Sequence, residues 1–155
     1  MSLEVIIGNN QEATEIPESW LTALEIVAHE AAALALENAA GHDSPLSHLG
    51  TLEVALVDDL TSDQVHRDFM GIDGPTDVIT FHHGEIVIGA EVAERQATEY
   101  AEPLAREILR YLVHGLLHLA GHEDTEPEER ATMEAAQETI VATLWTAELR
   151  ERLSY

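Results

Sequence analysis

The chain has 155 residues, 45% of them hydrophobic, a length and composition typical of one folded domain with one core. It contains no cysteine, which excludes disulfides and thiolate metal sites and leaves His, Asp and Glu as metal ligands. Its formal net charge is −23, with seven basic residues against thirty acidic ones. This charge argues against broad electrostatic binding of nucleic acid, and no DNA partner is expected. We expect residues 1–155 to form a single domain.

The N-terminal sequence has no basic start and only a short apolar run, so it does not resemble a signal peptide. The richest apolar stretch is interrupted by Arg106, Arg110 and His114, and we expect no segment long enough to span a bilayer. The expectation is therefore a soluble cytoplasmic protein without a membrane partner, whose acidic residues mostly face solvent.

The first half of the chain alternates between strand and helix patterns. Apolar residues alternate with polar ones in the strands and recur at helical spacing in the helices. The predicted elements are a strand from Leu3 to Ile7, a helix from Pro17 to about Ala40, a loop from Gly41 to Pro45, a strand from Leu52 to Leu56 and a short helix from Ser62 to Phe69.

The second half begins with two strands so closely linked that an antiparallel hairpin is expected. Long helices follow, and Thr125 and Glu128 predict a capping box for the last one, with Pro127 in its first turn. The predicted elements are a turn from Gly71 to Pro75, strands from Val78 to Phe81 and from Glu85 to Ile88, a helical region from Val92 to Ala120 with a break near Pro103, and a final helix to about Arg152. Together they predict an α+β domain in which a small mixed sheet packs against several helices, one of them a metal-binding helix in the core with a zincin-like site.

The most informative stretch starts with His114 and His118, which lie four residues apart on a predicted helix. They are separated by about 6 Å along the helix axis, so both imidazoles can reach one ion. Gly121 is where the helix can end and the chain can reverse. Asp124 then completes a spacing, H-x-x-x-H-x-x-G-x-x-D, that parallels that of the metzincins, and it is the preferred third ligand. His122 is the alternative.

Three protein ligands leave an open position on the ion, which is expected to be Zn2+, with manganese or nickel as alternatives. An ion of this kind lowers the pKa of a bound water and so favours a hydrolase. Gly115 stands where zinc peptidases place a catalytic glutamate, which argues against a peptidase. The candidate general bases are Glu123, Asp77 and Glu85, although Asp77 is equally typical of a strand cap and Glu85 of an edge strand.

Several segments resemble the YbeY family of bacterial metal-dependent endoribonucleases. The likeness runs from about Leu52 to Ala142, and its segments keep the family's order. Those segments are H-G-L-L-H-L-A-G at His114–Gly121, G-P-T-D-V-I-T-F at Gly74–Phe81, G-E-I-V-I at Gly84–Ile88, A-E-R-Q-A at Ala93–Ala97, and Met133. The resemblance implies a zinc-binding α+β domain that acts in ribosomal RNA maturation and ribosome quality control, with ribosomal RNA or ribosomal proteins as partners.

The chain departs from the family pattern at the site itself. Asp124 stands where the family has a histidine ligand, and Met70 stands where it has an arginine that is thought to contact RNA. Arg67, one helical turn earlier, is the candidate substitute. These departures leave two alternatives open: a ribosome-associated binding protein that has lost catalysis, and a metallohydrolase of a peptide or small phosphoester.

Overall fold

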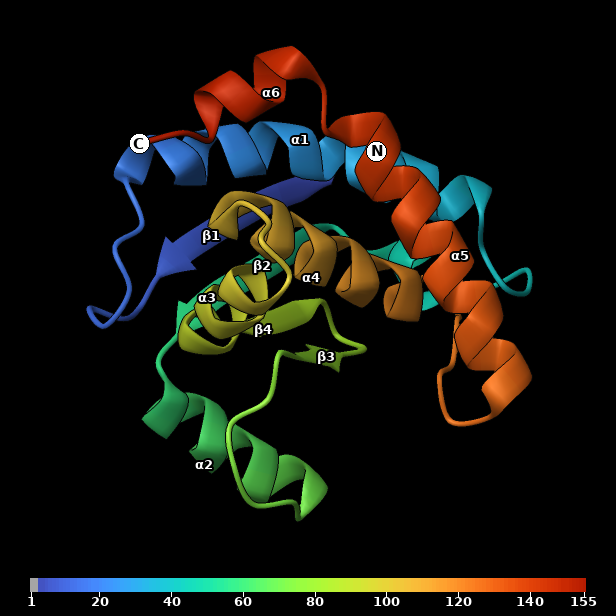
Figure 1. The fold of residues 1–155 in the computed structure, drawn as a ribbon. Helices are drawn as coiled ribbons and strands as arrows, with labels where there is room; N and C mark the ends of the chain where they lie inside the picture. Colours follow the sequence, from blue (N-terminus) through green and yellow to red (C-terminus); the bar gives the residue numbers. More distant parts are fainter. Residues whose placement is uncertain (1–2) are drawn as a thin grey trace.

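The computed structural model describes residues 3–155 as one four-stranded sheet with helices on both faces (Figure 1). The strand order is β1-β2-β4-β3, in which β1 and β2 as well as β2 and β4 are parallel. β3 runs antiparallel to β4, so the expected hairpin and the mixed sheet are confirmed. The strands are β1 (Glu4–Asn9), β2 (Thr51–Val57), β3 (Val78–Phe81) and β4 (Glu85–Gly89).

The helices form a thick layer on one face of the sheet and a thin one on the other. α4 is central and contacts α1, α3, α5, β3 and β4 (Figure 1). On the opposite face, Val65 of α2 packs against a small apolar cluster that includes Val57 and Val87. The helices are α1 (Glu18–Glu37), the 3-10 turn η1 (Pro45–His48), α2 (Asp59–Met70), α3 (Ala90–Glu99), α4 (Leu104–Leu119), α5 (Pro127–Leu144) and α6 (Ala147–Arg152).

α4 packs against the sheet at Gly115, where there is little room for a side chain. A Cβ at this position would lie 2.7 Å from Cδ1 of Ile86 on β4, so a larger residue would require either the Ile86 side chain or the helix to shift. Leu112, Leu116 and Leu119 fill the buried stripe of α4 and have at most 1% of their surface exposed. The polar side of the helix, with its two histidines, is therefore held beside β3.

The end of the chain differs from expectation. The final helix is not continuous to Arg152, because α5 ends at Leu144 and Thr146 caps the separate helix α6 by accepting a 3.1 Å hydrogen bond from the amide of Leu149. The predicted capping box is also wrong: the N-cap of α5 is Glu126, without a side-chain cap bond to any described residue. Pro127 occupies the first turn as predicted.

The start of α2 and the end of the loop after α1 also differ from the prediction. α2 starts at Asp59, three residues earlier than expected, because the Asp58 carboxylate accepts a 2.8 Å hydrogen bond from the Thr61 amide. The loop expected at 41–45 leads into the short turn η1. The break at Pro103 between α3 and α4 is confirmed.

By length and composition alone, α1 is long and apolar enough to cross a membrane: it has 20 residues and contains an 18-residue window with a mean hydropathy of 1.2. The expectation that no segment meets these criteria is therefore wrong. In this fold α1 packs against β1, α4 and α5, with Trp20 and Leu24 among its buried residues. A core helix of a folded domain satisfies the same two criteria.

Candidate metal site

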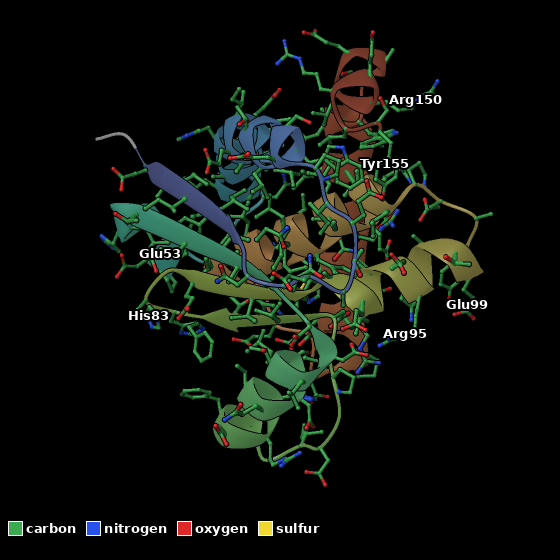
Figure 2. The ribbon with its side chains drawn as sticks, turned by 90° about the vertical axis from the view of Figure 1, so that its left-hand side faces the viewer. Glu53, His83, Arg95, Glu99, Arg150 and Tyr155 are labelled. Carbon is green, nitrogen blue, oxygen red and sulfur yellow. The ribbon has the colours of Figure 1, made fainter. Side chains whose placement is uncertain are left out.

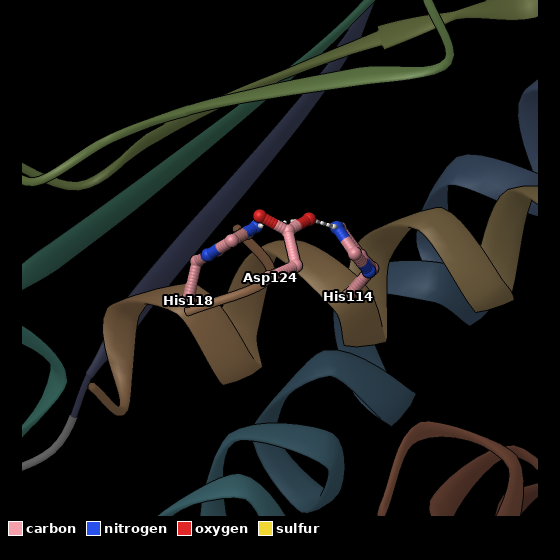
Figure 3. A group of neighbouring side chains, drawn as sticks. All are labelled: His114, His118 and Asp124. Atoms are coloured by element: carbon pink, nitrogen blue, oxygen red, sulfur yellow. Dashed lines mark ion pairs between the residues drawn. The ribbon is translucent and has the colours of Figure 1, made fainter. Parts of the chain in front are cut away.

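His114, His118 and Asp124 come together over the polar side of α4 (Figure 3). One donor atom from each lies within 4.8 Å of the others. Oδ2 of Asp124 is 3.5 Å from Nε2 of His114 and 3.4 Å from Nε2 of His118. All three side chains are partly exposed, so the cluster is open on one side. Two imidazole nitrogens and a carboxylate oxygen are a donor set that suits Zn2+ and similar ions.

The chain reversal that brings Asp124 back depends on Gly121. Its φ is +99°, and a Cβ there would lie 2.2 Å from the carbonyl oxygen of Ala40, the residue that follows α1 and its C-terminal turn. The amide of His122 donates a 3.0 Å hydrogen bond to the carbonyl of Leu117, and the amide of Ala40 donates to the carbonyl of Ala120, also at 3.0 Å. These hydrogen bonds hold the chain reversal to the end of α4 and to the segment that follows α1.

His122, the alternative third ligand, points away from the cluster. Its side chain is buried, and its Nε2 lies 2.6 Å from the carbonyl oxygen of Asn38 at the end of α1. Its backbone carbonyl, by contrast, lies 3.0 Å from Nδ1 of His118. His122 thus contributes a backbone acceptor that orients His118, while its ring joins the turn to α1.

In both His114 and His118, the Nδ1 atom makes a hydrogen bond and the Nε2 atom is directed toward Asp124. Nδ1 of His114 lies 2.8 Å from Oε1 of Gln137 on α5. Because carbonyl oxygens accept, both Nδ1 atoms carry the proton and both Nε2 atoms present a lone pair. Burial lowers the pKa of His114, which favours the neutral imidazole that metals bind.

Gln137 belongs to a longer chain of polar contacts that ties α4 to α5. Its Nε2 donates a 3.0 Å hydrogen bond to Glu138, and Arg110 of α4 donates to the same carboxylate at 2.9 Å. Arg110 also pairs with Glu102 and with buried Glu107. Burial opposes the charge on Arg110, but the hydrogen bonds to these carboxylates outweigh it and raise the pKa of Arg110.

The cluster lies in the wall of a cleft of about 550 Å3, which a second hollow of about 630 Å3 adjoins. Two predicted base candidates, Asp77 and Glu123, line this cleft with exposed side chains. Glu85 does not line it, because it starts β4, where it pairs with Glu53. β4 lies between β2 and β3, so the edge-strand interpretation of Glu85 is wrong. Its carboxylate lies 3.2 Å from Nε2 of His83, a residue of the link between β3 and β4 (Figure 2). The structure thus separates Glu85 from the other candidates.

Hydrogen bonds at the start of β3 hold Asp77 in place. Its Oδ1 accepts a 2.7 Å hydrogen bond from the Val78 amide, and its carbonyl accepts one from Gly89 at 2.8 Å. The preceding Thr76 is tied to α2, because its amide donates to Oγ of Ser62 at 2.9 Å and its carbonyl accepts from the same hydroxyl at 3.1 Å. The capping interpretation and the cleft-lining interpretation of Asp77 therefore apply together.

Met70 lines the cleft, but Arg67, its candidate substitute, does not. Arg67 pairs instead with Asp63 on α2 and with Asp73 in the turn that follows it. The arginine that does line the cleft is Arg130.

The sequence reasoning missed the residues that α5 brings to the site. Arg130, Glu134 and Gln137 follow one another at helical spacing, and the first two line the cleft. That spacing puts them on one face of the helix, which the amino-acid sequence alone indicates. It could not reveal that this face lies against α4, since the contact joins segments 23 residues apart in the His114–Gln137 pair.

Comparison with known proteins agrees with the resemblance. The model of the family described as Endoribonuclease YbeY matches residues 6–145. Proteins named Endoribonuclease YbeY are similar to this chain: that of Rhodopirellula baltica is 36% identical and aligns over 88% of this chain and 73% of its own length. Those of Moorella thermoacetica and Symbiobacterium thermophilum are 34% and 35% identical, over 90% and 92% of this chain and 96% and 97% of their own.

The fold has a counterpart among solved structures. The solution structure of TM1509 from Thermotoga maritima superposes with a TM-score of 0.58 at 24% identity, covering 95% of this chain and 92% of that one. This likeness supports the fold only. The family match over most of the chain and the identities above 30% are decisive, and the chain belongs to the YbeY family.

Proposed function

We propose that this protein is a metal-dependent endoribonuclease that acts in ribosomal RNA maturation and ribosome quality control. The observation that carries the proposal is the convergence of His114, His118 and Asp124 in a cleft, in a chain of the YbeY family. The relatives are named as endoribonucleases, and a cleft with acidic groups beside a three-donor cluster is chemically suited to hydrolysis of a phosphodiester.

The donor set fits a divalent transition-metal ion, with Zn2+ as the proposed species. Both Nε2 atoms are unprotonated by virtue of their Nδ1 partners, and Asp124 adds the negative charge that a dication requires. When bound there, such an ion would supply Lewis-acid stabilisation of a phosphoryl oxygen and activation of water.

The chain's own residues have distinct tasks in this proposal. Gln137 and the carbonyl of His122 hold the two imidazoles in place. Asp77 and Glu123 line the cleft as carboxylates that can accept a proton from the attacking water. Gly115 leaves no carboxylate at the position that zinc peptidases use, so a peptide substrate is disfavoured.

The setting of the activity is also part of the proposal. We place the protein in the cytoplasm, with ribosomal RNA as substrate and ribosomal proteins as contacts. The alternative is a ribosome-associated binding protein without catalysis, which Met70 and the net charge of −23 favour.

The test uses untagged protein, with metal content measured by elemental analysis and cleavage measured on ribosomal RNA with and without chelator. His118→Ala is expected to lose at least tenfold in metal affinity and most of the cleavage. His29→Ala is the control, because that histidine is exposed on α1, away from the cleft.

Cleavage by metal-loaded protein that chelator and His118→Ala abolish would support the proposal. Ribosome association without cleavage would favour the alternative. Equal metal content in His118→Ala and the unchanged protein would overturn the metal site.

A further inference from the structure

The protein has very few cations to offer a polyanionic substrate. All seven of its basic residues are arginines. Five of them pair with carboxylates of the same chain: Arg67, Arg95, Arg106, Arg110 and Arg152. Among residues 3–155, the two arginines without an ion pair are Arg130 and Arg150. Of the arginines in residues 3–155, these two are available to an approaching phosphate without competition from an ion-paired carboxylate.

Arg130 lies at the cleft. It is in the first turn and a half of α5, its side chain is exposed, and it lines the cleft together with His114, His118 and Asp124. Its Nε donates a 3.2 Å hydrogen bond to the backbone carbonyl of Asp124. That bond anchors the guanidinium by one edge, and within the described residues its two Nη atoms make no hydrogen bond.

Arg150 has the same charge but a different place. It lies on α6, where its side chain points outward on the far side of the molecule from the hairpin turn at His83 (Figure 2). It does not line the cleft. The chain therefore contains its own control for a free arginine away from the site.

We propose that Arg130 binds a phosphate group of the RNA substrate beside the metal site, and this inference rests on the proposed function. A guanidinium held by Nε presents its remaining N–H groups as a fork, a shape that matches two phosphate oxygens. Screening at physiological salt limits charge effects to about 8 Å, so a cation at the cleft matters more than the net charge of the whole surface. Arg130 is the cleft's arginine, and it is attached to the backbone of a candidate metal ligand.

The test measures binding of metal-loaded protein to single-stranded 2′-O-methyl RNA over a range of salt concentrations, with a gel to check that the RNA stays intact. Arg130→Ala is expected to weaken binding about tenfold at low salt. It should also reduce the slope of log affinity against log salt by about 0.7, the value for one phosphate contact on a single strand. Arg130→Lys should restore most of the slope, and Arg150→Ala should leave slope and affinity unchanged.

Metal content is measured for every variant, because Arg130 also touches Asp124. If Arg130→Ala loses metal and Arg130→Lys does not restore the slope, Arg130 acts through Asp124 and the inference is overturned. It is also overturned if the unchanged protein cleaves RNA while Arg130→Ala binds with the same slope. If the unchanged protein neither binds nor cleaves RNA, the proposed function itself fails, and this inference fails with it.

Discussion

Gln137 shows how much of the site depends on one residue outside the cluster. Its Oε1 lies 2.8 Å from Nδ1 of His114 and fixes which ring nitrogen carries the proton. Gln137→Leu is expected to weaken metal binding by about 10–100-fold, because His114 loses the acceptor that orients its ring and its tautomer is no longer fixed. Competition with a chromophoric chelator would measure this change.

Gln137→Glu is the matched variant, since it keeps an acceptor oxygen at the same place. Its metal affinity should stay within a few-fold of the unchanged protein or rise. Equal affinities for the leucine and glutamate variants would mean that the Gln137 contact does not tune the site.

At the scale of elements, the turn after α4 is the most demanding piece of the site. Gly121→Ala combines an unfavourable φ of +99° with a Cβ 2.2 Å from a backbone oxygen, which cannot move without shifting the end of α1. We expect it to lower the free energy of unfolding by at least about 3 kcal/mol, as measured by urea denaturation. Metal affinity should fall as well, because Asp124 follows the displaced turn.

Gly71→Ala separates the cost of the positive φ from the cost of the contact with Ala40. Gly71 also has a positive φ, +68°, but an added Cβ would meet nothing within 4 Å. Its cost should be only the backbone term of about 1–2 kcal/mol. A Gly71 variant as unstable as the Gly121 variant would show that the contact with Ala40 contributes nothing.

The elements that the sequence predicted well were those whose signal is local. Alternation predicted β1 and β2, the apolar residues at 78–81 and 85–88 predicted β3 and β4, and the tight link between Phe81 and Glu85 gave the antiparallel hairpin. The final helix was predicted too long because Thr146 reads as an ordinary helical residue until its side chain is seen to cap α6. The register between α4 and α5, which pairs His114 with Gln137, depends on packing that no single segment encodes.

The carboxylates around Arg110 give the junction of α4 and α5 a defined pH response. Hydrogen bonds from Arg110 lower the pKa of Glu102 below its ordinary 4.5. A folded-state pKa below the unfolded one gives stability that is complete above about pH 4.5 and is lost as the pH falls through the folded value. The difference in unfolding free energy between the unchanged protein and Glu102→Gln should therefore be largest near pH 7 and shrink below pH 4.5.

The control for this experiment is Glu148→Gln, which removes an exposed partner of Arg152 on α6. Exposed pairs contribute little, so its difference should be small throughout. A Glu102→Gln difference that stays constant between pH 7 and pH 3.5 would contradict the role assigned to the Arg110 cluster.

For the molecule as a whole, the excess of thirty acidic over seven basic residues sets the response to salt. Like charges on a compact surface repel, and the Debye length falls from about 30 Å at 0.01 M to about 3 Å at 1 M salt. Raising NaCl from about 20 mM to 500 mM should therefore raise the Tm, although it also weakens RNA binding. Near the sequence pI of 4.4 the repulsion disappears, so the same salt step should have little effect on Tm there. If salt lowered the Tm at pH 7, the arginine–carboxylate pairs would contribute more to stability than the repulsion among carboxylates removes. The charges of the protein would then be stabilising in sum.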